Sequence, residues 1–263
     1  MKIIVCVKVV LDPEAPASLF QVDTDNKKVI PPKGTPPVLN PFDENALEAA
    51  LRIKDSKGAS ITVLSMGKNI PKAIIRKCLA VGAEKLILAE DNLFEDLSGY
   101  STACVLAAAI KKIGQYDLIL CGRQASDTDA GLTGPGIAEM LGLPSITEAR
   151  KIEIVDDSTV KIERSISDGY TVISSKLPLL VTVSNEIGEL RSAALPAIIA
   201  SQKKEVTVWT SNDLGLNSSD LKKASIVKLF QPAHEGLCEI ITGTTADDAG
   251  TNLALKLRES KII

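Results

Sequence analysis

Apolar runs and amphipathic segments alternate along the first 142 residues of the chain. The short apolar runs are typical of buried strands, and they cover residues 2–10, 60–66, 85–89 and 118–121. Apolar residues at three- and four-residue spacing predict helices that begin near Asp43 and cover residues 70–81, 98–113 and 135–141, with Gly142 at the last stop. Four such strand–helix units predict an α/β fold, with a mostly parallel, doubly wound sheet.

The pattern changes after Pro144. Alternation predicts antiparallel strands over residues 151–155, 159–166 and 170–174, and an apolar run predicts a further strand over 179–183. We interpret these strands together as an antiparallel β extension of the same sheet. Residues 1–187 are therefore expected to form an α/β domain with this extension.

Residues 188–263 have weaker periodicity, and we expect a loop, a short helix over 196–201 and an extended arm. Because residues 203–245 have few apolar positions at regular spacing, we expect them to bury little core and to lie against another protein. Thr244 or Thr245 is expected to cap a final helix that ends at Ser260. The proline-rich segment 11–39 is expected to hold a hairpin around Asp25 and Asn26.

Composition and charge exclude several classes of protein. The net charge of −3 and the lack of a basic block argue against a nucleic-acid partner. No apolar run reaches the roughly 18 residues of a membrane span, so membrane insertion is not expected. The N-terminal apolar run contains Lys8 and meets Asp12 and Pro13, which favours a first strand over a signal peptide. We therefore expect a cytoplasmic protein, or one of an organelle matrix.

Cysteine and histidine usage argues against a metal site and against hydrolysis. The five cysteines are scattered without a C-x-x-C pair, and most lie in apolar patterns where cysteine acts as a small hydrophobe. The single histidine, His234, has no clustered carboxylates or cysteines around it in the sequence. A zinc site and a Ser–His–Asp triad are both disfavoured.

The segment Ile119–Gly142 holds the strongest candidate for chemistry. A strand stops at Gly122, a polar loop carries Asp127 and Asp129, and glycines precede a helix N-terminus. Parallel α/β proteins bind anionic ligands at such places, because free N–H groups and the helix dipole point at the loop. A plain strand-to-helix turn remains the alternative interpretation of these residues.

Sequence motifs exclude some kinds of nucleotide site and favour others. The first strand is not followed by G-x-G-x-x-G, and no Walker A sequence occurs, which argues against a phosphate-cleaving ATPase. The adenine-binding universal stress family has the same architecture, and Gly131–Gly134 matches the start of its glycine loop. The later small pair of that loop falls on Pro144 and Ser145, so this match is half complete.

A closer resemblance extends along nearly the whole chain. The motifs that carry it are Val5-Cys6-Val7-Lys8, Asn40-Pro41-Phe42-Asp43, Gly122-Arg123-Gln124-Ala125, Val160–Arg164, Leu177–Thr182 and Ala194-Leu195-Pro196. In this order and spacing they resemble the beta (small) subunit of electron transfer flavoprotein. The resemblance implies a heterodimer with an alpha subunit, whose FAD passes electrons between flavin dehydrogenases, such as those of the acyl-CoA type, and a downstream acceptor.

In that family the beta subunit binds an adenine nucleotide, either AMP or a second FAD, and it has no substrate-converting site of its own. The resemblance places the cofactor-binding residues at Cys6, Asn40, Pro41, Phe42, Asp43, Met66, Gly122, Arg123, Gln124, Ala125, Ser126, Asp127, Thr128, Asp129, Ala130, Gly131, Leu132, Thr133 and Gly134. It places partner recognition at Arg191, Leu195 and Pro196.

The nature of the nucleotide stays open between FAD and AMP. The Gly122–Ala125 segment is more similar to electron-bifurcating members, which favours FAD and makes NAD a possible further ligand. The loop after the first strand lacks the Val-Pro-Asp-Thr run of those members, and Ala130-Gly131-Leu132 matches neither subgroup. Thr171 stands where the family usually has an acidic or amide residue. A stand-alone adenine-nucleotide sensor of the stress-protein kind remains the alternative, although about 120 residues follow Pro144.

Overall fold

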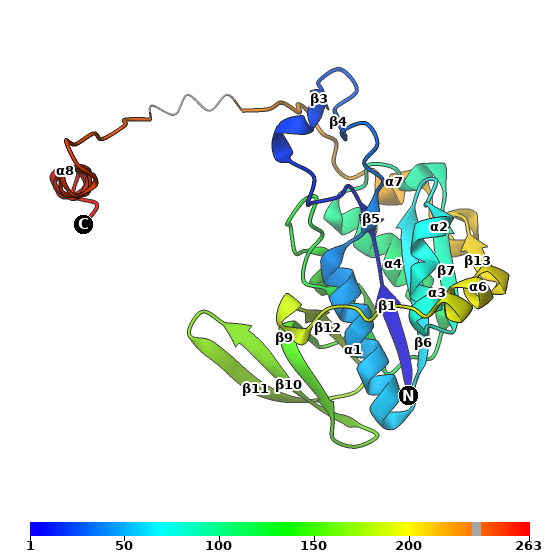
Figure 1. The fold of residues 1–263 in the computed structure, drawn as a ribbon. Helices are drawn as coiled ribbons and strands as arrows, with labels where there is room; N and C mark the ends of the chain where they lie inside the picture. Colours follow the sequence, from blue (N-terminus) through cyan, green and yellow to red (C-terminus); the bar gives the residue numbers. More distant parts are fainter. Residues whose placement is uncertain (233–237) are drawn as a thin grey trace.

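A nine-stranded sheet runs through the protein, which a computed structural model describes over residues 1–232 and 238–263 (Figure 1). The strand order is β11-β10-β9-β12-β8-β1-β6-β7-β13, and every pairing from β9 to β13 is parallel. The bounds are β1 (Lys2–Cys6), β6 (Ser60–Gly67), β7 (Lys85–Glu90), β8 (Leu118–Gly122), β9 (Ser145–Ile154), β10 (Thr159–Ile166), β11 (Gly169–Lys176), β12 (Leu179–Val183) and β13 (Val206–Trp209).

Helices cover both faces of this sheet, as its near-continuous apolar strands require. Ile3 and Val5 belong to the core cluster that includes side chains of α1 (Pro41–Lys57) and α3 (Lys77–Val81). Ile4 and Cys6 belong to the opposite cluster, with α4 (Gly99–Ile113) and α5 (Thr133–Leu141). Successive side chains of a strand point to opposite faces of the sheet, so the sheet divides the core into these two clusters. The predicted α/β class with a mostly parallel sheet is confirmed.

Several predicted boundaries change in the structure. β1 ends at Cys6, and the next apolar pair forms β2 (Val9–Val10), which leaves the sheet to pair with β5 (Val38–Leu39). The predicted helix over 70–81 is divided into α2 (Lys72–Ile75) and α3 at Arg76, whose guanidinium donates to backbone carbonyls of residues 201–204. The predicted hairpin is confirmed as β3 (Gln21–Asp23) and β4 (Lys28–Ile30).

The antiparallel extension is confirmed, but β12 is not part of it. β12 lies between β8 and β9 and pairs parallel with both, so the extension consists of β9, β10 and β11. Figure 1 shows these strands projecting from one end of the parallel sheet.

The expectation that residues 203–245 bury little core is wrong for their first part. After α6 (Leu195–Lys203), β13 extends the sheet beside β7. The short helix α7 (Ser218–Leu221) then packs back on the domain, and Leu221 is 1% exposed beside Phe94 and Val105. A short isolated segment can thus bury an apolar side chain, and hydrophobic periodicity does not detect so short a segment.

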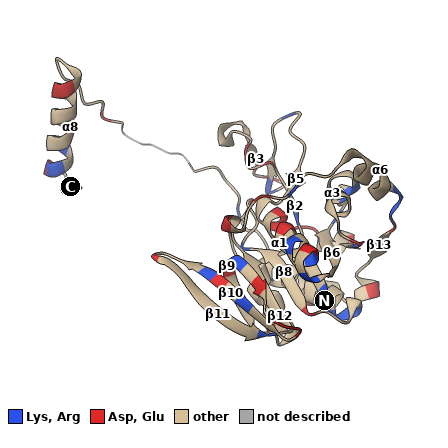
Figure 2. Ribbon diagram, turned by 60° about the horizontal axis from the view of Figure 1, so that its bottom comes forward, with Lys and Arg blue, Asp and Glu red and all other residues tan. Residues whose placement is uncertain are grey.

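The final helix, α8 (Ala246–Glu259), is separated from the α/β body (Figure 1). Thr245 caps it by accepting a hydrogen bond from the Asp248 N–H, as predicted. No α8 side chain is buried, and its acidic first turn and basic last turn suit the helix dipole (Figure 2). Among the described residues, no helix has the length and apolar character to cross a membrane.

Candidate functional site

A cavity of about 830 Å³ lies at the carboxyl ends of β1, β6 and β8. Its floor includes Cys6 and Cys121, and its rim includes Met66 and the loop from Gly122 to Gly134. Parallel sheets place their ligand sites at this edge, since the loops that follow neighbouring strands converge there. The cavity therefore occupies the position that the strand order predicts for a ligand.

The Asp43 carboxylate ties two of these strand ends together. Its oxygens accept hydrogen bonds from the backbone N–H groups of Lys8 and Gly122, at 2.8 and 2.9 Å. Asp43 lies in the first turn of α1 and is 7% exposed. The sequence suggests Asp43 as the N-cap of this helix, but the N-cap in the structure is Asn40. Burial raises the pKa of Asp43 to about 7, although the hydrogen bonds from both backbone groups act to lower it.

Asn40 connects the end of β1 to the loop that follows β8. Its side-chain amide donates to the Gln124 carbonyl at 2.8 Å, and its side-chain oxygen accepts from the Ser126 N–H at 3.1 Å. Its own N–H donates to the Lys8 carbonyl at 2.9 Å. Because Asn40 is 1% exposed and its bonds are made within the protein, it acts mainly by positioning the loop.

The loop ends in a helix N-terminus that no side chain caps. Asp129 and Gly131 have positive φ angles of 49° and 63°, which turn the chain into α5. The N-cap residue, Leu132, makes no side-chain cap hydrogen bond. The first N–H groups of a helix have no partner inside it, so this end can bind an anion at the cavity wall.

Cationic side chains flank the loop. The Arg123 guanidinium lies 4.9 Å from the ring centroid of Phe42, and its Nε is buried without a hydrogen-bond partner. The Lys8 ammonium pairs with Asp127 at 2.7 Å across the cavity mouth. Arg123 thus brings a positive charge to a cavity that it lines, which suits an anionic ligand.

Most of the predicted cofactor residues line the cavity, and four do not. The lining set includes Cys6, Asn40, Asp43, Met66, Gly122–Ala125, Asp127, Thr128 and Ala130–Gly134. Four predicted residues lie outside this set: Pro41, Phe42, Ser126 and Asp129. Of these, Phe42 stacks on Arg123, and Asp129 accepts a hydrogen bond from Gln124 at 2.6 Å.

Sequence reasoning missed two walls of the cavity. One contains Lys68 and the region from Asp96 to Thr102, which includes the start of α4. The end of β7 and the Ser98 cap were the available signals for this wall. The other wall is Ala224–Ile226, and no local pattern in the arm indicates that it returns to the site.

The predicted partner-recognition residues occupy two different environments. Leu195 begins α6 and is 68% exposed. Arg191 instead binds Glu48 and Asp55, and the Glu48 side chain is 6% exposed. Arg191 and Arg52 supply the opposite charges that allow this carboxylate to be buried on α1.

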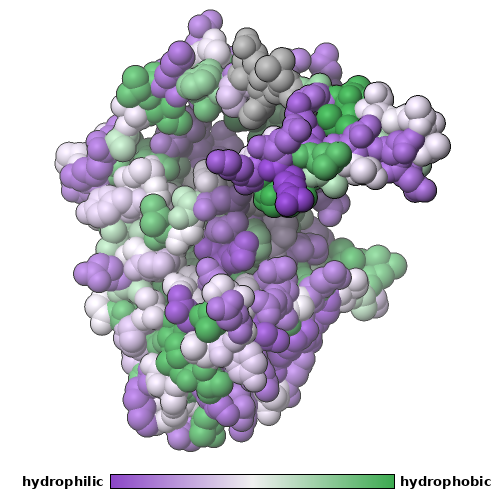
Figure 3. All heavy atoms as spheres, turned by 90° about the vertical axis from the view of Figure 1, so that its left-hand side faces the viewer, coloured by the Kyte–Doolittle hydropathy of each residue, from purple (hydrophilic) through white to green (hydrophobic). Residues whose placement is uncertain are grey.

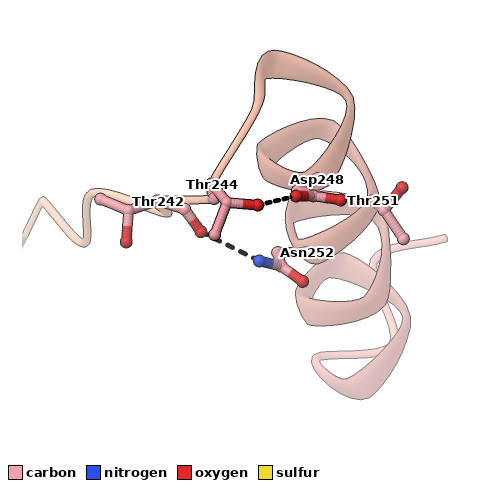
Figure 4. Close-up of a pocket in the computed structure, with 6 residues that line it drawn as sticks. Thr242, Thr244, Asp248, Thr251 and Asn252 are labelled. Atoms are coloured by element: carbon pink, nitrogen blue, oxygen red, sulfur yellow. Dashed lines mark hydrogen bonds between the residues drawn. The ribbon is translucent and has the colours of Figure 1, made fainter.

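A second hollow lies beside α8 and has no features of a ligand site (Figure 4). Its polar groups bond to one another: Thr244 to Asp248, and Asn252 to the Thr242 carbonyl at 2.9 Å. This arrangement caps the helix. No group of three potential metal ligands occurs in residues 1–232 and 238–263, and His234 lies outside the described residues.

Comparisons with known proteins show the family of the chain. A model of the electron transfer flavoprotein domain matches residues 29–214. The chain is 37% identical to the electron transfer flavoprotein subunit beta of Thermoanaerobacterium thermosaccharolyticum, over the whole of both chains. It is 36% identical to the caffeyl-CoA reductase-Etf complex subunit CarD of Acetobacterium woodii, again over both whole chains. It is 34% identical to protein FixA of Azorhizobium caulinodans, covering 86% of this chain and 80% of that protein.

Proposed function

The chain belongs to the electron transfer flavoprotein family, and we propose that it is the beta subunit of a heterodimeric electron carrier that binds an adenine nucleotide. The observation that carries the nucleotide is the cavity at the carboxyl ends of β1, β6 and β8, bordered by an uncapped helix N-terminus. Family membership supports the electron-transfer role, and the position and surroundings of the cavity support a nucleotide as the ligand.

The residues present suit a nucleotide. Phosphate oxygens would meet the N–H groups of Gly131–Gly134, where the dipole of α5 favours negative charge. The Thr133 hydroxyl and the unpartnered Arg123 Nε would add donors. Asp43 and Asn40 would hold the two surrounding loops at a fixed separation, because their hydrogen bonds span both loops.

The size of the cavity favours FAD over AMP in this subunit. Its volume of about 830 Å³ lies near the upper end of the range of roughly 300–1,000 Å³ that small-molecule sites span. FAD has more than twice the non-hydrogen atoms of AMP, so it would fill more of this space.

The flavin, when bound, supplies the one- and two-electron chemistry, and the chain supplies binding and orientation. We propose no substrate-converting residue in this chain. In a bifurcating complex, NAD is a further candidate ligand. One relative is a subunit of a caffeyl-CoA reductase-Etf complex, which makes a CoA-ester reductase a candidate partner of this chain as well.

Two exposed regions support partner binding. The apolar side chains of Leu195, Ile198 and Ile199 on α6 are exposed. We assign them to the binding of a flavin dehydrogenase, of the acyl-CoA or another type. The arm carries exposed Val227, Phe230 and Ile240, which suit the alpha subunit. Apolar side chains also gather on the face that carries β10 and β11 (Figure 3).

Co-purification with the alpha subunit tests the proposal. We expect the heterodimer to release two FAD molecules, measured by its absorbance spectrum and by chromatography of the extracted nucleotides. One FAD with AMP would assign the chain to the plain carriers. A chain that forms a homodimer, binds ATP and ignores the alpha subunit would contradict the proposal and support the stress-sensor alternative.

A further inference from the structure

Two cysteines meet on the floor of the cavity. β1 and β8 are parallel neighbours, and their register places Val5 opposite Leu120, so the next residues, Cys6 and Cys121, are opposite one another. Both thiols point to the same side of the sheet, because Cys6 and Cys121 belong to the core cluster of Ile4 and Ile119. Neighbouring strands are about 4.8 Å apart, which brings the two side chains together.

A reagent can reach these two thiols through the cavity. Cys6 and Cys121 are 7% and 6% exposed, and both line the cavity. The other described cysteines are different: Cys78 is fully buried on the opposite face of the sheet, while Cys104 and Cys238 do not line the cavity.

We propose that Cys6 and Cys121 form a dithiol site for trivalent arsenicals and that a nucleotide in the cavity blocks it. In the reaction with an organic arsenic(III) oxide, two S–H bonds break and two As–S bonds form. The oxide oxygen leaves as one water molecule with both thiol protons. Arsenic stays trivalent, so no oxidant or reductant is required.

The surroundings of Cys121 limit its disulfide chemistry. Contact with Cys6, together with burial, raises the pKa of the Cys121 thiol. Disulfide exchange depends on the thiolate and is therefore slow at such a thiol. The condensation with arsenic(III) is balanced with Cys121 in its protonated form, because the thiol protons leave in the water molecule.

The competition with nucleotide rests on the proposed function, whereas the bridging of two thiols does not. A Cβ on Gly134 would lie 3.7 Å from the Cys121 Cβ, so the thiol floor directly adjoins the α5 N-terminus. An aryl group on the arsenic would extend into the space that we assign to the nucleotide. Both ligands therefore cannot occupy the cavity together.

Phenylarsine oxide and intact-mass spectrometry test the bridging on the full-length chain. We expect one phenylarsenic group per nucleotide-free chain, retained against a monothiol and released by 2,3-dimercaptopropanol. Either Cys6→Ala or Cys121→Ala should abolish this retention, and the matched Cys104→Ala/Cys238→Ala double variant should keep it. Retention in both single variants would overturn the dithiol site.

Peptide mapping keeps the test valid if a core variant fails to fold. In the wild-type chain the arsenical should link the peptides that contain Cys6 and Cys121, and linkage elsewhere would overturn the assignment. For the competition, AMP or FAD at about one hundred times its Kd should slow modification about a hundredfold. An unchanged rate with nucleotide shown to be bound would overturn the blocking, while leaving the bridging to be judged by the variants.

Discussion

The Asp43 carboxylate accepts a hydrogen bond from the Gly122 N–H at 2.9 Å, although 79 positions separate the two residues. Its other oxygen accepts from the Lys8 N–H, so one side chain of α1 joins the ends of β1 and β8. This contact determines the spacing of the two loops that border the cavity.

Folding stability should depend on pH through Asp43. Burial raises its pKa to about 7 in the folded chain, against about 3.9 when unfolded. The folded chain therefore binds more protons between these values. The stabilisation from this group is complete below the unfolded pKa and is lost as pH rises through about 7.

Urea unfolding at several pH values measures this effect. Asp43→Asn should remove the pH dependence in this window and lower stability by about 1–3 kcal/mol, because its amide would face a backbone N–H. The exposed Asp157→Asn variant serves as the control and should keep the wild-type profile. A wild-type profile in the Asp43 variant would show that another group is responsible.

A side chain at Gly122 should disrupt the same contact. Its Cβ would lie 2.5 Å from the Asp43 Oδ1 and 2.6 Å from the Phe42 carbonyl carbon. We expect Gly122→Ala to lower the free energy of unfolding by about 1–3 kcal/mol and to reduce nucleotide retention. Gly250→Ala on α8 is the control, since its Cβ would meet no atom within 4 Å and the residue does not line the cavity. Equal losses in both variants would contradict the explanation.

Arg191 should stabilise the chain itself, before any partner binds. It donates to the buried Glu48 with two guanidinium nitrogens at 3.0 Å, so Arg191→Lys keeps the charge but loses the paired geometry. We expect this variant to lower stability by roughly 1–3 kcal/mol in urea unfolding of the isolated chain. Unchanged stability, with weaker dehydrogenase binding, would instead assign Arg191 to recognition alone.

Leu195 should act in docking alone. Because its side chain is 68% exposed, Leu195→Asp should leave stability and nucleotide content unchanged and weaken binding to the dehydrogenase. Titration of the dehydrogenase by calorimetry measures the affinity. Leu19→Asp, at an exposed position outside α6 and outside the face of β10 and β11, is the control and should bind as the wild type does. Loss of flavin from the Leu195 variant would assign α6 to the cofactor site.

The two parts of the C-terminal segment should contribute differently to stability. Leu221→Ala empties a buried position beside Phe94 and should cost about 2–5 kcal/mol. Leu253→Ala on α8 should change stability by less than about 0.5 kcal/mol, since no side chain of that helix is buried. Denaturant titration compares the two variants, and a large loss from Leu253→Ala would place α8 against the domain.

Gly134 shows how the structure changes an expectation that the sequence supports. From sequence, a valine there is expected to remove the nucleotide and leave the fold intact. The structure places a Cβ at this position 2.6 Å from the Thr182 Cγ2, so the substitution would strain the contact between α5 and β12. Loss of nucleotide in a Gly134 variant would therefore not identify the site by itself.

The sequence alone determined the alternation of strands and helices, the antiparallel extension, the glycine loop and the family. These features depend on local spacing, which hydrophobic periodicity and motif order record directly. The hairpin around Asp25 and the Thr245 cap are further local features, and both agree with the structure.

Tertiary structure decided which of these local features act together. The Asp43 bridge, the Glu48–Arg191 pair, the Cys6–Cys121 pair and the return of Ala224–Ile226 to the cavity all join distant parts of the chain. Such contacts follow from strand order and register, which bring residues together without any local signal in the sequence. For this reason the nucleotide loop could be predicted from its glycines, whereas the residues that hold it in place and complete its cavity could not.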